Sequence, residues 1–403
     1  MIRIYLTIIS IFFAQHLLAQ HTIKGKIINA DDRSPIAGAS IYINNSSLGT
    51  SSNKEGLFTI HSPTRNVELV VSSMGFEKRV LEIQIPLQQD LIIAIKEKST
   101  AIEEVVVTNY LKDGWKEWGQ FFTDNLIGQG GFADDCKILN HEVVKFRFDK
   151  KANVLTAICT EPLKIRNDAL GYELTYDLGG FRMDFGSKMF LFEGYAFFKD
   201  IGKGRSKYKK NRNTSYLLSL NRFVRSTYNK EWEKDGYIVR KLVKKDNEVR
   251  TEAVQKYNAI LDSVQKKYRG NWKLFYASQT DFTEDQVNTI RKQRIQPEKI
   301  SYLMGIMQPD EIIVGQDKEK GLMKLNYTDY LYIIYPADFS KSKNKILQKA
   351  ASEVSELFIM DSDGIIIEPQ GSYFPTASWI LSGYAVSYSK LAYMLPLDYV
   401  PTE

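Results

Sequence analysis

Histidine is the first residue type to test for chemistry, because it serves both as a metal ligand and as a general base near neutral pH. Beyond residue 20 the chain has three histidines, His21, His61 and His141. His141 opens the run HEVVK, but Lys145 stands where an H-E-x-x-H zinc helix needs its second histidine. An ammonium group cannot replace a neutral imidazole as a ligand. We therefore expect His141 to be an ordinary surface residue, and we expect no metal and no cofactor.

Acidic and glycine-rich motifs give no stronger signal. DSDG at 361–364 lacks the later ligands of a calcium loop, so we expect a hairpin turn there. The pair Asp134/Asp135 has the residue types of a glycosidase, although 48 acidic residues make chance pairs inevitable. GQGGF at 128–132 lacks the Lys and Ser/Thr of a phosphate loop and predicts a flexible loop. The sequence therefore identifies no catalytic residue.

The segment KGRSKYKKNR, residues 203–212, places six cations in ten residues. A dense positive patch attracts lipid phosphates or acidic glycans. The candidate anion-binding residues are Arg205, Lys207, Lys209, Lys210 and Arg212. The alternative, which we favour, is a solvated helix face whose charge is balanced by an acidic remainder of the fold. Because the basicity is local, it does not indicate a nucleic-acid partner.

Residues 1–20 predict export. Arg3 precedes an apolar run from Ile4 to Phe13, and the small residue Ala19 follows at a plausible cleavage point. We predict a signal peptide over residues 1–19 and a mature chain in the periplasm or associated with the outer membrane. No later segment has 18 uninterrupted apolar residues, so we do not expect an integral helical membrane protein.

Residues 20–108 are predicted to form an all-β sandwich, because half-buried strands need a second sheet over their apolar faces. The expected strands are short β-branched or alternating runs between turn residues: TIKGKII, ASIYIN, LFTIHS, VELVVSS, KRVLEIQI and LIIAIK. The stretch AIEEVVVTNY, 101–110, is expected to supply the last strand and the exit from the sandwich.

The turn motifs of this region resemble a known family. Gly25, the PIAGA turn at 35–39, Gly49-Thr50, the NKEGLF turn and Gly75-Phe76 are similar to the carboxypeptidase-regulatory-like (CarboxypepD_reg-like) domain of envelope proteins from Bacteroidetes-type bacteria. The resemblance implies a prealbumin-like or immunoglobulin-like sandwich of seven strands, without catalytic residues of its own. The zinc spacing of a metallocarboxypeptidase, a His followed three residues later by Glu, does not occur beyond residue 20.

Residues 109–403 are predicted to form an α+β region. Trp115, Trp118, Phe122 and Leu126 recur at helical spacing. Alternating runs predict antiparallel strands over 140–200, apolar residues at heptad-like steps predict helices over 205–294, and strands return over 298–403. The segment EPLKIRNDALGYELTYDL and the tail LAYMLPLDYVP resemble an uncharacterised family of envelope proteins from the same bacteria, which implies no reaction or ligand.

Two cysteines, Cys136 and Cys159, leave two alternatives open. In an oxidising compartment they can close one disulfide, and otherwise they are buried free thiols.

These observations favour an exported, non-enzymatic envelope protein. In this interpretation the sandwich is an interaction or structural module, and the C-terminal region binds an unknown partner, protein or glycan, or a ligand. The alternative is a periplasmic or surface hydrolase of glycans or peptides that uses a carboxylate pair. A pocket with two carboxylates about 5–10 Å apart would favour the hydrolase.

Overall fold

The computed structural model describes residues 21–98, 110–278, 281–375 and 378–401. The predicted signal peptide and most of the stretch 101–110 lie outside the described residues.

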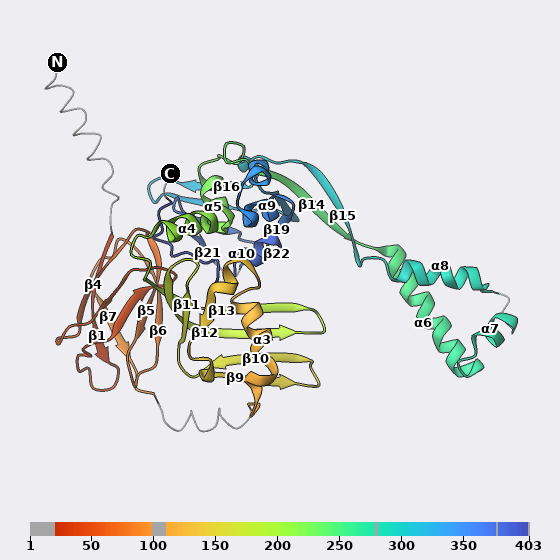
Figure 1. Cartoon of the computed structure of the whole chain (residues 1–403), viewed down its shortest axis with the longest axis horizontal. Helices are drawn as coiled ribbons and strands as arrows, with labels where there is room; N and C mark the ends of the chain where they lie inside the picture. Colours follow the sequence, from red (N-terminus) through yellow and green to blue (C-terminus); the bar gives the residue numbers. More distant parts are fainter. Residues whose placement is uncertain (1–20, 99–109, 279–280, 376–377, 402–403) are drawn as a thin grey trace, which may run out of the picture.

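The N-terminal region is a two-sheet sandwich, shown in red and orange in Figure 1. Its strands are β1 (His21–Asn29), β2 (Ser40–Ile43), β3 (Gly49–Ser51), β4 (Leu57–Ser62), β5 (Asn66–Ser72), β6 (Arg79–Gln84) and β7 (Leu91–Ile95). They pair in the orders β4-β1-β7 and β3-β2-β5-β6. Alternate residues of β1 and β4 point into a core that includes Ile23, Ile27 and Phe58. The predicted sandwich is confirmed.

Gly25 has a physical role in this sandwich. β1 pairs with β7 in parallel, with Gly25 opposite Leu91. A Cβ atom on Gly25 would lie 2.5 Å from the carbonyl oxygen of Leu91 and 2.8 Å from the ring of Phe58. Any larger residue would therefore force the strand away from both neighbours.

The second part begins with an amphipathic helix on a six-stranded antiparallel sheet. The helix is α3 (Gly114–Leu126), and Phe122 on its buried face contacts the rings of Phe146 and Phe181. The sheet has the order β8-β11-β12-β10-β9, with β13 paired to β12. Its strands are β8 (Cys136–Ile138), β9 (Val144–Asp149), β10 (Val154–Cys159), β11 (Leu163–Asn167), β12 (Tyr172–Asp184) and β13 (Met189–Asp200).

Two further sheets and four helices complete the body of the chain. One sheet has the order β15-β14-β18-β19-β22 and the other β16-β17-β20-β21. Their strands are β14 (Ile238–Asp246), β15 (Lys299–Ile306), β16 (Ile313–Asp317), β17 (Leu322–Leu325), β18 (Tyr330–Ile334), β19 (Val354–Ile359), β20 (Ile365–Ile367), β21 (Tyr373–Phe374) and β22 (Trp379–Gly383). The helices are α4 (Ser206–Leu218), α5 (Leu220–Tyr228), α9 (Lys345–Ala351) and α10 (Tyr384–Tyr388). One hydrophobic core runs through these elements and the six-stranded sheet.

Three predictions of local structure differ from the observed fold. The section 205–294 is not all helical, because Ile238–Asp246 is strand β14, with Val239 and Leu242 buried between two partner strands. The section 298–403 contains helices α9 and α10 among its strands. The turn at 361–364 joins strands of two different sheets, β19 and β20, so it does not close a hairpin. For β14 the deciding partners, β15 and β18, are remote in the sequence.

The sandwich docks on the rest of the chain through its β2–β3 loop. The Asn45 N–H donates to the Ala196 carbonyl at 2.8 Å, and the Leu397 N–H donates to the Asn45 carbonyl at 2.7 Å. Lys78 forms an ion pair with Asp177 at 2.9 Å. These contacts place the loop between β13 and the C-terminal tail, which is where the site described below lies.

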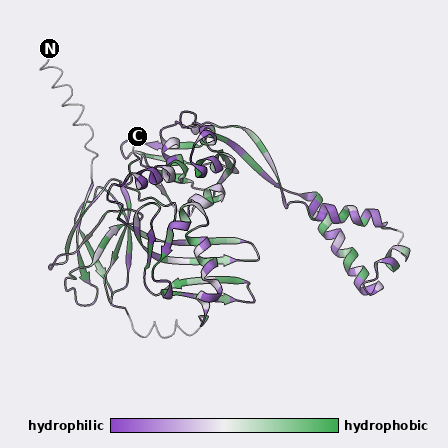
Figure 2. Cartoon of the chain, viewed as in Figure 1, coloured by the Kyte–Doolittle hydropathy of each residue, from purple (hydrophilic) through white to green (hydrophobic). Residues whose placement is uncertain are grey.

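A helical tip lies at the far end of a two-stranded ribbon formed by β14 and β15 (Figure 1). It consists of α6 (Glu248–Tyr268), α7 (Trp272–Ser278) and α8 (Glu284–Arg294), has its own small core, and is largely hydrophilic outside (Figure 2). Asn247 is buried at the junction, where its side chain caps α6 and donates to Pro297. Every residue of β15 is exposed.

Because the core of the tip is separate from that of the body, the body should fold without it. Asp246 pairs with Lys299, so an Asn-Gly turn can replace residues 247–298 and close the ribbon as a two-residue hairpin. We expect the unfolding free energy of the shortened protein to lie within about 1 kcal/mol of the body's value in the full chain. Calorimetry of both proteins checks this. Loss of a cooperative transition in the shortened chain would show that the tip supports the body.

Among the described residues, no helix is long and apolar enough to cross a membrane.

Candidate functional site

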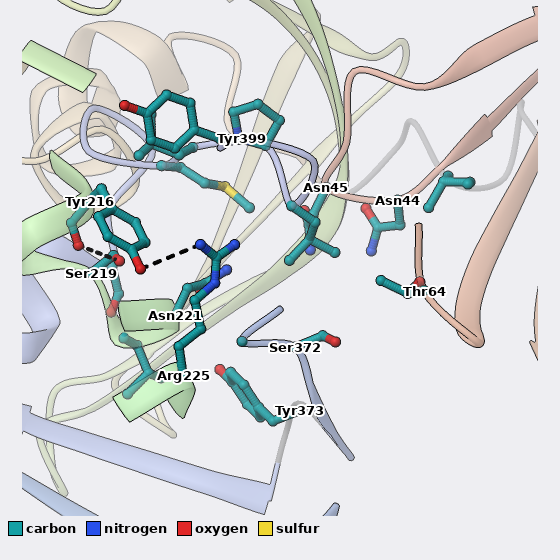
Figure 3. A pocket seen from close by; sticks show the side chains of 18 of the residues that line it. Asn44, Asn45, Thr64, Tyr216, Ser219, Asn221, Arg225, Ser372, Tyr373 and Tyr399 are labelled. Carbon is teal, nitrogen blue, oxygen red and sulfur yellow. Dashed lines mark hydrogen bonds between the residues drawn. The ribbon is translucent and has the colours of Figure 1, made fainter. Parts of the chain in front are cut away.

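A cavity of about 220 Å³ lies where the sandwich meets the C-terminal region. The sandwich contributes the β2–β3 loop and the start of β5, and the rest of the wall comes from α4, α5, β21 and the tail after α10. Figure 3 shows Arg225 reaching into this space beside Tyr216, with Asn44 and Asn45 of the sandwich across from it. The two parts of the chain therefore form the cavity together.

Arg225 supplies the positive charge of this cavity, and Glu68 supplies a negative charge. Its Nε donates to the Gln370 carbonyl at 2.6 Å, and its Nη1 donates to the Tyr216 hydroxyl at 3.3 Å. Of the described carboxylates, none lies within 4.0 Å of the Arg225 guanidinium, whereas Arg212 and Arg222 on the same helices pair with aspartates. Arg225 is thus a half-buried cation without an ion-pair partner among the described residues, although the Glu68 carboxylate, which accepts from the Asn44 amide, also lines the cavity.

Asn45 supplies an unused acceptor. Its side-chain oxygen is buried and accepts no hydrogen bond from the described residues. The backbone is in the left-handed region, with φ of 57°, and both backbone groups are bonded, so the backbone is held in place at this residue. A buried polar atom without a partner costs about 1–3 kcal/mol. A ligand that donates a hydrogen bond to this oxygen would recover that cost.

The predicted basic cluster does not form one site. Arg205, Lys207, Lys209 and Lys210 are exposed around the first turns of α4. Arg212 is instead 11% exposed and donates to both Asp200 oxygens and to the carbonyls of Leu170 and Gly171. Anion binding by the four exposed side chains stays a prediction, while Arg212 already has its acceptors.

The structure gives little support to a carboxylate pair. Asp134 and Asp135 are exposed in a short 3₁₀ segment. Asp200 and Asp398 share a surface hollow, but Asp200 is held by Arg212, which lowers its pKa, and Asp398 accepts from the backbone and hydroxyl of Ser47. A glycosidase acid needs the opposite shift, a raised pKa.

The HEVVK segment that begins at His141 does not form the helix that a zinc motif needs. His141 is exposed, begins a 3₁₀ turn before β9, and its ring lies 4.7 Å from that of Trp115. Within the described residues, no group of three or more His, Cys, Asp or Glu side chains could hold a metal ion.

The two cysteines are free thiols, which decides against the disulfide alternative. Cys136 is on β8 and Cys159 on β10, and two strands of the sheet, β11 and β12, separate them. Three strand spacings are about 14 Å, far beyond the reach of a disulfide. Burial raises the pKa of each thiol to about 12, which makes both poor nucleophiles.

The comparisons with known proteins identify the N-terminal part. Residues 23–107 match the model of the CarboxypepD_reg-like domain, so the sandwich is a domain of this type. No curated protein matches the chain.

Solved structures give only weak similarities. A chain of a type II cohesin–X–dockerin complex from Acetivibrio cellulolyticus is 17% identical, with a TM-score of 0.18. The match covers 21% of this chain and 62% of the Acetivibrio chain. A protein of unknown function from Bacteroides fragilis is 9% identical over 91% of this chain and 98% of its own, with a TM-score of 0.16. Such TM-scores carry no argument about fold or function.

Proposed function

We propose that this chain is an exported, non-enzymatic envelope protein that binds a small ligand between its CarboxypepD_reg-like sandwich and its C-terminal region. The observation that carries the proposal is Arg225, a cation without a carboxylate partner in a cavity formed by both parts. The sandwich then acts as one wall of a binding site rather than as a separate module. The periplasm or the outer-membrane surface remains the proposed location.

The cavity favours a carboxylate-bearing, polyhydroxylated ligand such as an acidic sugar. A guanidinium group pairs with a carboxylate through two parallel hydrogen bonds. Asn45 offers an acceptor for a hydroxyl group, and the rings of Tyr216 and Tyr399, 6.2 Å apart, offer apolar surface. A cavity of about 220 Å³ is below the usual size of drug-binding pockets, which suits a single sugar ring.

Calorimetric titration with glucuronate, galacturonate and glucose tests this function. We expect the uronates to bind and glucose to bind at least tenfold more weakly. Only the uronates carry a carboxylate that can form an ion pair with Arg225. Arg225→Ala should weaken uronate binding by about 10–100-fold, the value of one charge-assisted pair. Arg182→Ala is the matched control, since Arg182 is exposed on β12. Equal affinity for glucose and the uronates, or full binding by Arg225→Ala, would contradict the proposal.

A further inference from the structure

A second cavity shares Tyr388 and Tyr393 with the first. Its volume is about 690 Å³, and its walls come from the end of α3, the glycine-rich loop 128–131, α9 and α10. Neither Arg225 nor any cation of the basic segment 203–212 lines it. Four of its features together point to one class of ligand.

The first feature is Lys390, a buried cation without a counter-ion. Lys390 is 7% exposed, and its Nζ donates to the Asn125 carbonyl at 2.5 Å. The ring faces of Phe190 and Phe192 lie 4.5 and 5.3 Å from Nζ. Of the described residues, none places a carboxylate within 4.0 Å of this ammonium group. Burying a charge without an opposite charge is costly, and an anionic ligand would remove that cost.

The second feature is the charge of the cavity wall. Lys345 and Lys349 of α9 line it together with Lys390. Asp124 is the acidic residue on the wall, and its two oxygens already accept from the side-chain amides of Gln120 and Gln129, at 2.7 and 2.8 Å. Three cations thus face one carboxylate, so the local potential attracts anions.

The third feature is the loop that the sequence marked only as glycine-rich. Gly128, Gly130 and Gly131 all have positive φ, at 111°, 68° and 60°. A side chain at Gly131 would collide with the Tyr393 hydroxyl, so the loop approaches the tail as only glycine allows. Residues 129–131 donate no backbone hydrogen bond to the described part of the chain, which leaves three amide donors for a ligand.

The fourth feature is an independent sign of a missing partner. Tyr388 is 6% exposed, and its hydroxyl lies near Tyr384 but makes no hydrogen bond of acceptable geometry. A phosphate oxygen accepts hydrogen bonds from hydroxyl, amide and ammonium donors alike. An oxyanion would therefore satisfy Tyr388, the loop amides and Lys390 with the same group.

We propose that this second cavity binds a phosphate-bearing ligand through Lys390, Lys345, Lys349, Tyr388 and the backbone amides of residues 129–131. A phosphate loop normally carries its lysine within its own motif, whereas here the lysines come from α9 and the tail. The two cavities share Tyr388 and Tyr393, but Arg225 lines only the first, and the three lysines line only the second. Free phosphate and a lipid headgroup are two possible sources of the same chemistry.

Titration of the full chain with inorganic phosphate at pH 7 tests the site, and sedimentation with phosphatidylglycerol vesicles against phosphatidylcholine vesicles identifies the source. Phosphate binding without vesicle binding supports a soluble ligand, and binding to both supports a lipid headgroup. We expect Lys390→Met and the rim double variant Lys345→Ala/Lys349→Ala each to weaken phosphate binding at least tenfold. Lys151→Ala, an exposed lysine in the β9–β10 turn, should leave it unchanged.

The rim variant keeps the proposal testable if Lys390→Met does not fold, because both rim lysines are exposed. Unchanged affinity in a folded variant of either kind would overturn the proposal. So would the absence of both phosphate and vesicle binding by the wild-type chain.

A pH series adds a second readout. Burial lowers the pKa of Lys390 to about 8 and raises the pKa of Tyr384, Tyr388 and Tyr393, so these tyrosines stay neutral. Lys345, Lys349 and Asp124 are the remaining charged groups on the wall. Sulfate suits this series because its charge is constant. Its affinity should fall about tenfold from pH 7 to pH 9, as Lys390 loses its proton, and should stay flat in Lys390→Met. A flat wild-type profile would contradict the role of Lys390.

Discussion

Replacing Arg212 by alanine is expected to lower the free energy of unfolding by about 2–4 kcal/mol. Its guanidinium donates to both oxygens of Asp200, at 2.8 and 2.9 Å, and to the carbonyls of Leu170 and Gly171, at 2.7 and 3.0 Å. It also lies 3.9 Å from the centre of the Tyr172 ring. Alanine would leave these acceptors without their donor and open a gap between α4 and the Tyr172 ring of β12.

Urea unfolding measures this loss against a matched control. The triple variant Lys207→Ala/Lys209→Ala/Lys210→Ala removes more charge from the same helix, but all three side chains are exposed. We expect each of these three substitutions to change stability by no more than about 0.5 kcal/mol. The free energy of unfolding of Arg212→Lys should lie between those of Arg212→Ala and the wild-type protein. An ammonium group keeps the charge but lacks the planar fork of guanidinium. Equal stability of Arg212→Ala and the triple variant would contradict a structural role for Arg212.

The same contact gives a pH dependence. Arg212 lowers the pKa of Asp200 below its ordinary value, so the pair stabilises the fold above that ordinary value. The stabilisation is lost as the pH falls through the lowered pKa. Arg212→Ala should therefore lack this part of the acid sensitivity that the wild-type protein shows.

The difference between the paired Arg212 and the exposed lysines changes how anion binding by the basic cluster should be tested. A variant that neutralises Arg212 together with the lysines would confuse lost folding with lost binding. The triple lysine variant, with Arg212 intact, is the informative protein for a low-salt assay with anionic vesicles. Unchanged vesicle binding by this variant would favour the interpretation of a solvated helix face.

The three-residue strand β3 was not among the predicted runs, but the other six observed strands of the sandwich could be predicted because their signals are local. Each is a short run between turn residues, and β4 alternates exposed and buried residues along its whole length. The β12–β13 hairpin is also local, since its two strands follow one another in the sequence. β14 has no such signal, because its partners β15 and β18 follow it after long insertions.

The candidate sites could not be predicted, because remote residues assemble them. Arg225 is one of many cations in a basic segment, and only the fold shows that it lacks the aspartate that Arg212 has. Lys390 bonds to a carbonyl 265 residues away. The segment 128–132 lacks the Lys and Ser/Thr of a phosphate loop, so its sequence predicts only a flexible loop. Charge density and local motifs cannot show which groups are already paired.

The second large effect is expected at Glu368, where alanine should cost about 2–4 kcal/mol of unfolding free energy. Glu368 is 2% exposed, although it carries a carboxylate. One oxygen accepts from the Asn66 amide of the sandwich at 2.9 Å, and the other accepts from the Ser372 hydroxyl at 2.6 Å and the Gln370 amide at 3.1 Å. The carboxylate thus joins the sandwich to the turn after β20, next to the cavity of Arg225, which Asn66 and Ser372 also line.

Removing this side chain leaves buried donors on both parts of the chain without an acceptor. Urea unfolding of Glu368→Ala should show the loss, and Glu142→Ala, whose side chain is 70% exposed, should show none. Glu368→Gln keeps the shape but turns an N–H₂ group toward at least one donor, so an intermediate loss is expected.

A double-mutant cycle with Asn66→Ala separates the contact between the two parts from the contacts within the turn. If the Asn66–Glu368 hydrogen bond holds the sandwich in place, the two losses should be coupled by about 1–2 kcal/mol. Additive losses would instead mean that Glu368 stabilises only its own turn. In that case the sandwich would be held by the backbone contacts of the β2–β3 loop, and the cavity of Arg225 would keep its shape without Glu368.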